Sequence, residues 1–407
     1  MPAPSTAAEP RVLAAASSVG GVREVLRVGA RPTGETKGRI NLIVPSIGAR
    51  ATFGGIQTAI DAFSAIAGAS ARARIISAEP IDPDVLGSFS GYRSVVAGDD
   101  SDAPREIVSI AGPDVTIPVG PDDVFIATFW TTAALAFEFR AWQALEYGNA
   151  PRRCAYLIQD YEPAFYPASA QSVLARATYD SPESTIAIFN TATLRDHFHD
   201  LGIRFTSEYT FEPRLSQALR SMSVRPPVVR ARRIVAYGRP GKPRNAFPLL
   251  VDALRVWRAT YQGAEQWSVV SAGEAHRAVD LGDGLVMHSV GKLDIQAYGD
   301  LLKESAIGVS LMVSPHPSYP PLEMAQLGML VLTNRFGDKD LATWHTNITS
   351  IGSLSAVGVA ADLGALCRRF ELNPTVGDLG QLMRPNYLDD GPQFPFAADV
   401  ATMLRGG

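Results

Sequence analysis

The sequence has little cysteine, no long apolar run and no excess of positive charge, and each absence excludes a class of protein. Its 407 residues include only two cysteines, Cys154 and Cys367, and neither belongs to a C-x-x-C pair. Disulfides and structural zinc are therefore not expected, and a cytoplasmic protein is favoured. No stretch reaches the roughly 18 apolar residues of a membrane span. The net charge of −4 argues against a general nucleic-acid-binding protein, which is usually basic.

Several chemical motifs are also missing. The sequence has no G-x-G-x-x-G or Walker pattern, so dinucleotide and P-loop chemistry are not indicated. No group of Asp or His has the spacing of a metal site, and we expect neither a metal nor another cofactor. Residues 1–37 are rich in Ala, Ser, Gly and Pro and are too weakly apolar for a signal peptide. We interpret them as a loosely packed extension with at most peripheral membrane contact.

Strand-like runs alternate with helical segments along most of the chain. The strand-like runs are RINLIVPSI, ARIISA, DDVFIATFW, RCAYLIQD and STIAIFN, then RIVAYGRP, WSVVSAG, GLVMHSVG, AIGVSLMVSP and MLVLTNRF. This rhythm predicts an α/β protein with two doubly wound, Rossmann-like domains, residues 38–213 and 214–390. A final helical segment, residues 391–407, is expected to pack back on the first domain. Residues 79–121 fit the rhythm poorly and are predicted to be an insertion.

Two candidate motifs follow predicted strands and precede helices. In ARATFGGIQ, Gly54 and Gly55 would let backbone N–H groups approach a phosphate at a helix N-terminus. A simple helix-entry turn is the alternative. In YGRPGKPRNAF, Arg239, Lys242 and Arg244 lie within one short loop, and guanidinium groups match a diphosphate in a bidentate manner. A solvated basic loop is the alternative there.

A third motif, SPHPSYPPLE, joins a strand to a helix through a stiff, proline-rich loop. Proline is tolerated in the first helical turn, and the carboxylate of Glu323 near that end can accept hydroxyl hydrogen bonds. A glutamate that only complements the helix dipole is the alternative. Lys292, in HSVGKLD, is either one more cation of the site or a surface lysine.

The strings TFWTT and QDYEP end two neighbouring predicted strands of the first domain. Trp130 is a candidate for stacking on a sugar face, and Asp160 and Glu162 are candidates for binding acceptor hydroxyls. Core packing is the alternative for Trp130, and a carboxylate that stabilises its own loop is the alternative for the other two.

These motifs, in this order, resemble the GT-B glycosyltransferases, specifically the retaining enzymes of family 4. Gly54 and Gly55 match the early Gly-Gly loop, and Arg239 matches the arginine of the second motif. Arg244 and Asn245 take the places of a lysine and a glycine, and LEMAQLGMLVLTN supplies the closing glutamate. The sequence departs from the pattern at Pro315, where the family has its first glutamate. INLIVPSI, YLIQDYEPAFYP and SPHPSYPPLEMAQLG are most similar to rhamnosyltransferases that extend bacterial surface polyrhamnose.

The resemblance implies transfer of L-rhamnose from dTDP-β-L-rhamnose to a growing surface glycan, free or lipid-linked, at the inner face of the plasma membrane. The residues assigned by this reasoning are Arg239, Arg244 and Asp160 for catalysis, Gly54, Gly55, Lys292, Tyr319 and Glu323 for donor binding, and Trp130 and Glu162 for the acceptor. In these roles the cations stabilise the departing diphosphate, and Glu323 binds the deoxyribose 3′-hydroxyl. Two alternatives stay open: a UDP- or GDP-sugar donor, and a protein that binds a sugar nucleotide without turnover.

Overall fold

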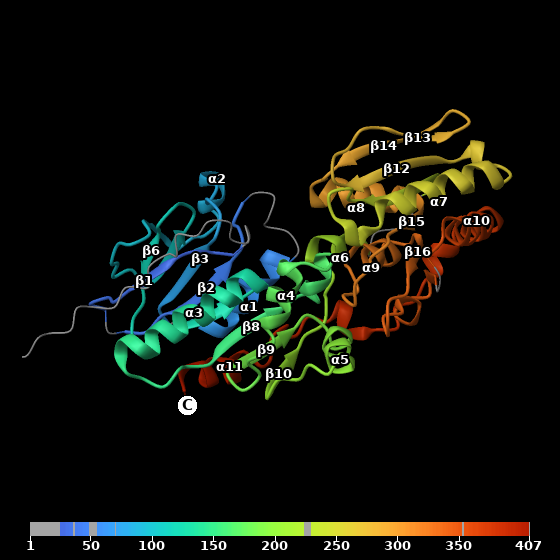
Figure 1. Ribbon diagram of the computed structural model, residues 1–407. Helices are drawn as coiled ribbons and strands as arrows, with labels where there is room; N and C mark the ends of the chain where they lie inside the picture. Colours follow the sequence, from blue (N-terminus) through green and yellow to red (C-terminus); the bar gives the residue numbers. More distant parts are fainter. Residues whose placement is uncertain are drawn as a thin grey trace, which may run out of the picture. The chain divides into compact units, whose positions relative to one another are not determined.

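The computed structural model describes residues 25–35, 37–48, 55–69, 71–223, 229–351 and 354–406. The chain divides into two compact units (Figure 1). Unit 1 comprises Met1–Phe211 and Pro392–Gly407, and unit 2 comprises Glu212–Gly391. Each unit is built around its own largely parallel sheet. Within the described ranges, no helix is both long and apolar enough to cross a membrane.

The main sheet of unit 1 has eight strands in the order β10-β9-β8-β7-β2-β3-β5-β4, and every neighbouring pair is parallel. The strands are β2 (Ile40–Val44), β3 (Ala73–Ser77), β4 (Arg93–Val95), β5 (Arg105–Ser109), β7 (Val124–Ala127), β8 (Cys154–Ile158), β9 (Thr185–Phe189) and β10 (Ser207–Thr210). The first central strand, β2, lies between β3 and β7, so the chain order reverses at the β2–β7 pair. In open α/β sheets, ligands bind beyond the strand carboxyl ends at such a reversal.

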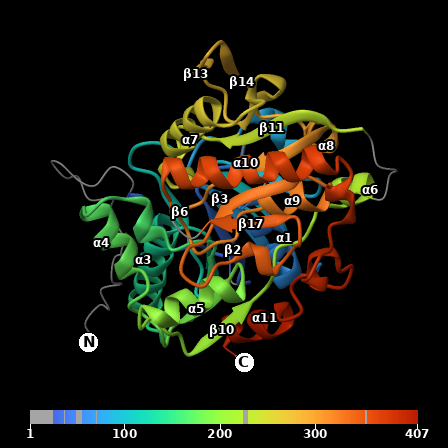
Figure 2. The ribbon, with the colours of Figure 1, turned by 90° about the vertical axis from the view of Figure 1, so that its right-hand side faces the viewer.

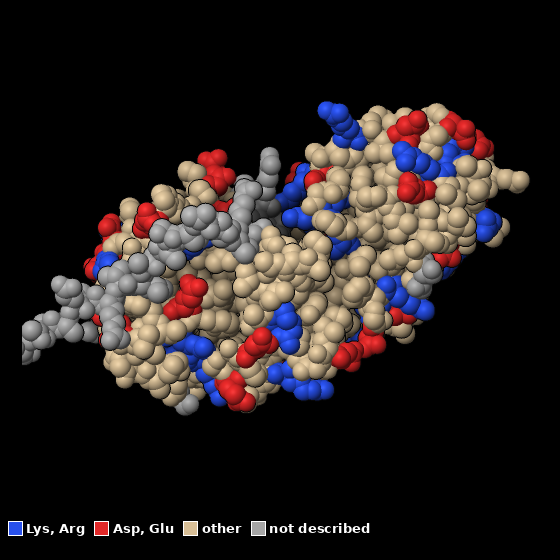
Figure 3. Space-filling view, in the orientation of Figure 1, with Lys and Arg blue, Asp and Glu red and all other residues tan. Residues whose placement is uncertain are grey.

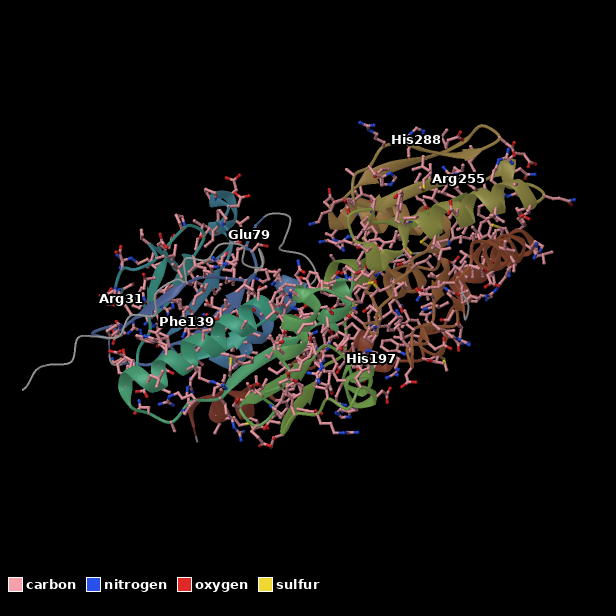
Figure 4. The ribbon with its side chains drawn as sticks, viewed as in Figure 1. Arg31, Glu79, Phe139, His197, Arg255 and His288 are labelled. Carbon is pink, nitrogen blue, oxygen red and sulfur yellow. The ribbon has the colours of Figure 1, made fainter. Side chains whose placement is uncertain are left out.

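Helices cover both faces of this sheet. They are α1 (Gly55–Ala67), α2 (Pro83–Leu86), α3 (Trp130–Tyr147), η1 (Glu162–Phe165), α4 (Ala170–Ala177), α5 (Ala192–Asp200) and α11 (Ala397–Arg405). Because side chains alternate along a strand, Leu42 packs with α1 and α11 whereas Ile43 packs with α3 and α5. Phe139 of α3, labelled in Figure 4, is fully buried in the second of these cores.

The expectation of an insertion over residues 79–121 is wrong. This segment contributes β5, which pairs with β3, and β4 at the sheet edge. The misreading has a physical cause, because β5 begins with two charged residues. Glu106 is only 1% exposed and lies 3.6 Å from the guanidinium of the equally buried Arg39. The second position of β5 is therefore occupied by a buried, ion-paired glutamate, whereas a strand is recognised in a sequence by apolar residues at its buried positions.

The N-terminal extension is also not uniformly loose. Strand β1 (Gly29–Arg31) pairs in parallel with β6 (Thr116–Pro118), and Val28 and Ala30 are buried against the core. Arg31, labelled in Figure 4, forms an ion pair with Asp100, with 3.1 Å between nitrogen and oxygen. The part of residues 1–37 that reaches this strand is therefore integrated into unit 1.

The sheet of unit 2 has seven strands in the order β13-β14-β12-β11-β15-β16-β17, and only the β13–β14 pair is antiparallel. The strands are β11 (Ala231–Gly238), β12 (Ser268–Gly273), β13 (Val279–Gly282), β14 (Leu285–Gly291), β15 (Ser305–Val309), β16 (Leu330–Asn334) and β17 (Ile348–Ile351). The chain order reverses between β11 and β15. The carboxyl ends of these two strands are therefore the expected ligand edge of unit 2.

Helices again cover both faces. They are α6 (Gln217–Ser223), η2 (Pro243–Asn245), α7 (Phe247–Thr260), η3 (Ala264–Gln266), α8 (Ile295–Glu304), α9 (Pro320–Gln326), η4 (Leu341–Thr343), α10 (Ala356–Leu372), η5 (Val376–Leu379) and η6 (Pro385–Leu388). Ile234 and Ala236 of β11 pack with α7 and α10, which lie side by side in Figure 2. Val235 packs on the opposite face with α6, α8 and α9.

Candidate functional site

The carboxyl ends of β11 and β15 bring two of the predicted motifs into one region of unit 2. The loop after β11 carries Arg239, Lys242 and Arg244, and the loop after β15 leads to Tyr319 and Glu323. Since these strands flank the reversal of chain order, the topology places both loops at the position where α/β sheets bind ligands.

The basic loop after β11 is tightly built. Its turn closes with Lys242 N–H donating to the Arg239 carbonyl at 3.0 Å, and Gly241 N–H donates to the carboxylate of Glu274 at 3.2 Å. Gly238 allows the strand to end here, because a Cβ on it would lie 2.1 Å from Ser271 Oγ. The loop therefore has one defined conformation, held by a glutamate that the sequence reasoning did not identify.

Backbone and amide hydrogen bonds fasten the two loops to each other. Val313 N–H donates to the Arg244 carbonyl at 2.7 Å, and the Asn245 amide donates to the Leu311 carbonyl at 3.2 Å. From the next strand, Asn334 Oδ1 accepts from Met312 N–H at 2.6 Å. The position of Arg244 relative to the proline-rich loop is thus fixed by the main chain.

The proline-rich loop supports itself through its own side chains. Ser314 Oγ accepts from His316 N–H at 3.0 Å, and His316 Nδ1 accepts from Ser318 N–H at 3.0 Å. Ser318 has a positive φ of 67°, which the bond from His316 helps to hold. All three side chains are buried, and His316 is a structural residue of the loop.

Glu323 lies in the first turn of α9, and its carboxylate meets a tyrosine from another helix. The Tyr298 hydroxyl of α8 donates to Glu323 Oε2 at 3.1 Å. The Glu323 side chain is half-buried, and burial raises the pKa of its carboxyl to about 7, while the bond from Tyr298 acts in the opposite direction. Near neutral pH this group therefore exchanges between a proton and a negative charge.

Tyr237 is hydrogen-bonded to one of the cations of the basic loop. Alternation along β11 places it on the same face as Val235, towards α8 and α9. Burial raises the pKa of its hydroxyl, which is hydrogen-bonded to Arg239 and lies in the electrostatic field of Glu323 and Arg244. Tyr237 is the first residue of the YGRP string, and the sequence reasoning did not identify it. Its hydroxyl relates Arg239 directly, and Arg244 and Glu323 through their electrostatic fields, to one side chain.

Lys292 is placed differently. It is exposed and follows β14, which is separated from β11 by β12. It therefore lies at the same edge of the sheet but two strands away from β11. In the strand order, Lys292 is further from Glu323 than Arg239 and Arg244 are.

The unit 1 candidates fall on and around the β2–β7 reversal. Gly54 lies outside the described residues. Gly55 opens α1, and a Cβ on it would lie 2.3 Å from Gln159 Oε1, so the helix start approaches the end of β8 closely. Asp160 is 5% exposed, and its Oδ1 accepts from Tyr161 N–H at 2.9 Å.

Trp130 and Glu162 are buried against each other, 1% and 2% exposed. Glu162 Oε2 accepts from Trp130 N–H at 2.6 Å and from the Tyr156 hydroxyl at 2.8 Å, while the Trp130 indole donates to Tyr166. The carboxylate thereby accepts a hydrogen bond from a backbone N–H in the first turn of α3, which has no partner within the helix. These contacts are those of the packing alternative, and neither side chain offers a surface to a glycan in this structure.

An open pocket of about 350 Å³ lies beside this region in unit 1. Its lining residues are Tyr161, Pro163, Ser172, Val173, Arg176, Ala177 and Asp180. An aromatic ring beside hydroxyl, guanidinium and carboxylate groups suits a sugar, although Arg176 and Asp180 already pair with each other. Across the described parts of both units, no group of three or more His, Cys, Asp or Glu could hold a metal ion.

Two family models match the chain, one in each unit. "WsaF, N-terminal domain" matches residues 39–192, and "WsaF, C-terminal domain" matches residues 232–364. Together they cover more than half of the chain. The chain belongs to the WsaF family. The Arg239 loop, Lys292 and Glu323 all fall within the match to the C-terminal domain.

A curated relative and two solved structures add to this membership. The O-antigen biosynthesis protein RfbC of Myxococcus xanthus is 34% identical over 212 residues, which are 52% of this chain and 15% of that protein. The structure of Anabaena Alr3699/HepE in complex with UDP aligns with a TM-score of 0.55 at 10% identity, covering 90% of this chain and 95% of that one. WaaG, a glycosyltransferase involved in lipopolysaccharide biosynthesis, aligns with a TM-score of 0.53 at 12% identity, covering 90% and 100%.

The structural likeness fixes the fold. At 10–12% identity the likeness shows the fold alone and not the substrate. Each alignment covers 90% of this chain and so extends over both units. The two doubly wound α/β units of this WsaF-family chain have the GT-B fold, as the sequence predicts.

Proposed function

We propose that this WsaF-family protein is a retaining glycosyltransferase that moves L-rhamnose from dTDP-β-L-rhamnose to a growing bacterial surface glycan. The observation that carries the proposal is that the loop with Arg239 and Arg244 and the loop leading to Glu323 lie together at the β11–β15 reversal, joined by hydrogen bonds. A sugar nucleotide has a diphosphate for the cations and a nucleoside hydroxyl for the carboxylate. Family membership and the O-antigen relative support a surface glycan as the product.

In this proposal the chain's own groups act on the diphosphate and the nucleoside. The guanidinium groups of Arg239 and Arg244 stabilise the negative charge that develops as the bond from the sugar to the diphosphate breaks. Tyr237 orients Arg239 through their hydrogen bond. Glu323 accepts the deoxyribose hydroxyl, and the main chain near Tyr319 meets the diphosphate or the sugar. No metal takes part, so turnover should survive a chelator.

The expected location is the cytoplasm, where sugar nucleotides serve as donors. Both cysteines are free and buried, as suits a reducing compartment. On the face shown in Figure 3, acidic and basic side chains both occur between large uncharged areas, and several Lys and Arg lie together at one end of unit 2. Because the net charge is −4, we propose sugar nucleotide and glycan as partners rather than nucleic acid.

The test compares Arg239→Ala with Arg232→Ala, which removes an exposed arginine at the opposite end of the same strand. We expect Arg239→Ala to lower kcat for release of dTDP from dTDP-rhamnose by about 100-fold, with a much smaller change in donor affinity. Arg232→Ala should match the unaltered protein. Equal losses of kcat and affinity would contradict the leaving-group role.

A UDP- or GDP-sugar donor is the second candidate. Glu323 binds the sugar of the nucleoside rather than the transferred sugar, and a structure of the same fold, HepE, is a complex with UDP. Thermal-shift titration with dTDP, UDP and GDP distinguishes the donors, because a ligand at 100 times its Kd adds about 2.7 kcal/mol to the folded state. Binding of dTDP-rhamnose without hydrolysis or transfer would instead indicate a non-catalytic protein.

A further inference from the structure

Tyr298 lies on α8, and its hydroxyl is directed at the carboxylate of Glu323. The helix begins at a defined place, because Asp294 caps it by accepting from Ala297 N–H at 2.8 Å. This start fixes Tyr298 in the first turn, with its ring packed against the core shared by α6, α8 and α9. A rigid aromatic side chain on a capped helix places its hydroxyl with little freedom.

The direction of this hydrogen bond is determined. Burial raises the pKa of the Tyr298 hydroxyl well above 10, and the nearby Glu323 carboxylate raises it further. The hydroxyl is therefore always protonated and donates, and Glu323 Oε2 accepts. Among the described residues, no side chain or backbone group donates to Oε1, and the Glu323 side chain is only half-buried. One oxygen is occupied from within the protein and the other is accessible to a ligand.

Tyrosines from other elements also face this carboxylate. Tyr237 of β11 and Tyr387 of η6 lie in its electrostatic field, and the Tyr387 hydroxyl is buried without a hydrogen-bond partner in the described structure. Of the cations, Arg239 is hydrogen-bonded to Tyr237. Tyr298 is thus the group that sets the orientation of the Glu323 carboxylate within unit 2.

We propose that Tyr298 is a positioning residue that leaves Glu323 best suited to accept a hydrogen bond from a single nucleoside hydroxyl. The site then prefers 2′-deoxyribonucleoside diphosphates over ribonucleoside diphosphates. A ribose presents two adjacent hydroxyls, which two carboxylate oxygens receive best. Oε2 already accepts from Tyr298 and has one acceptor direction left, so it receives the 2′-hydroxyl less well than an unoccupied oxygen would. A deoxyribose leaves only the 3′-hydroxyl, which Oε1 receives. This inference rests on the proposed function, because it assumes that Glu323 binds the nucleoside.

The experiment measures binding of dUDP and UDP, which differ only in the 2′-hydroxyl, by calorimetry. The full-length protein is expected to bind dUDP about tenfold more tightly than UDP, and Tyr298→Phe is expected to lose most of this ratio. Tyr387→Phe is the matched control, because it removes a buried hydroxyl that makes no hydrogen bond. It should keep the ratio of the unaltered protein.

A pH profile separates positioning from packing. Since the Tyr298 hydrogen bond lowers the pKa of Glu323, Tyr298→Phe should shift the midpoint for dUDP binding to higher pH. A change that only loosened the fold would weaken both nucleotides equally and leave the midpoint in place. A thermal melt of each variant shows whether it is folded.

Two results would overturn the inference: an equal dUDP/UDP ratio in Tyr298→Phe and the unaltered protein, or a preference of the unaltered protein for UDP. Absence of binding by either nucleotide would refute it together with the proposed function. If dUDP is preferred but dTDP-rhamnose is not turned over, the proposed transfer fails and the role of Tyr298 stands.

Discussion

Glu323→Gln is expected to make the protein more stable at alkaline pH while abolishing nucleotide recognition. The carboxyl group of an unfolded chain releases its proton near pH 4.5, whereas burial raises the pKa of Glu323 in the folded protein to about 7. The folded state therefore binds the proton more tightly, and its stability falls as the pH rises from 4.5 to 7. Above pH 7 the full cost of the charged carboxylate is present, and glutamine removes that cost.

The magnitude follows from the two pKa values. Their difference corresponds to about 3 kcal/mol, and partial exposure of the side chain reduces the expected gain to about 1–2 kcal/mol. For a unit of this size the gain raises Tm by about 3–6 °C. The amide oxygen of glutamine can still accept from Tyr298, so packing is retained. Calorimetric melts at pH 8.5 should show the full gain, and melts at pH 4 should show almost none.

Glu265→Gln is the control, because Glu265 is an exposed glutamate of the same unit. It should change Tm little at either pH. A Glu323→Gln variant with the same Tm difference at both pH values would refute the reasoning, since the effect would then come from packing. In the unaltered protein, nucleotide affinity should fall about tenfold between pH 8 and pH 6, as only about a tenth of the carboxyl groups are ionised at pH 6.

Two further predictions concern stability. Gly238→Ala should destabilise unit 2 by about 1–3 kcal/mol in a urea titration, because the added Cβ overpacks the end of β11; Gly87→Ala, where a Cβ meets nothing within 4 Å, should be nearly neutral. Glu162→Ala should cost about 2–4 kcal/mol, because it leaves the buried donors of Trp130 and Tyr156 unpaired. An unchanged urea midpoint in Glu162→Ala would mean that the carboxylate does not support α3.

The sequence predicts two doubly wound α/β domains because their strands are marked by apolar runs and turn residues, as in RIVAYGRP, and the resemblance of the motifs to glycosyltransferases implies the GT-B fold. It fails where tertiary contacts override the local pattern. Strand β5 is not recognisable in the sequence, because its first two residues, Arg105 and Glu106, are charged. Glu106 can be buried there only because it pairs with Arg39, which is distant in sequence. Strand β1 is three residues long, and its register exists only through β6.

The same distinction applies to the candidate site. Arg239 and Glu323 could be selected because they lie at strand and helix ends, positions that local signals reveal. Tyr298 could not, because it reads as one residue of an amphipathic helix, and its relation to Glu323 depends on how α8 packs beside α9. The sequence also does not reveal that Trp130 and Glu162 are buried and hydrogen-bonded to each other, because that contact joins segments 32 residues apart.

Glu323 differs from the buried charges that are held in ion pairs, such as those of unit 1, and the contrast bears on function. At the amino ends of the unit 1 strands, Asp123 lies 3.0 Å from Arg39 and 3.6 Å from Arg74, so each charge has an opposite partner. Glu323 in unit 2 receives only a neutral tyrosine among the described residues, while Arg239 is bound to Tyr237. A carboxylate without a cation lowers stability, and a glutamine would serve the fold better. The residue is therefore explained by what it can accept from a ligand rather than by what it adds to the fold.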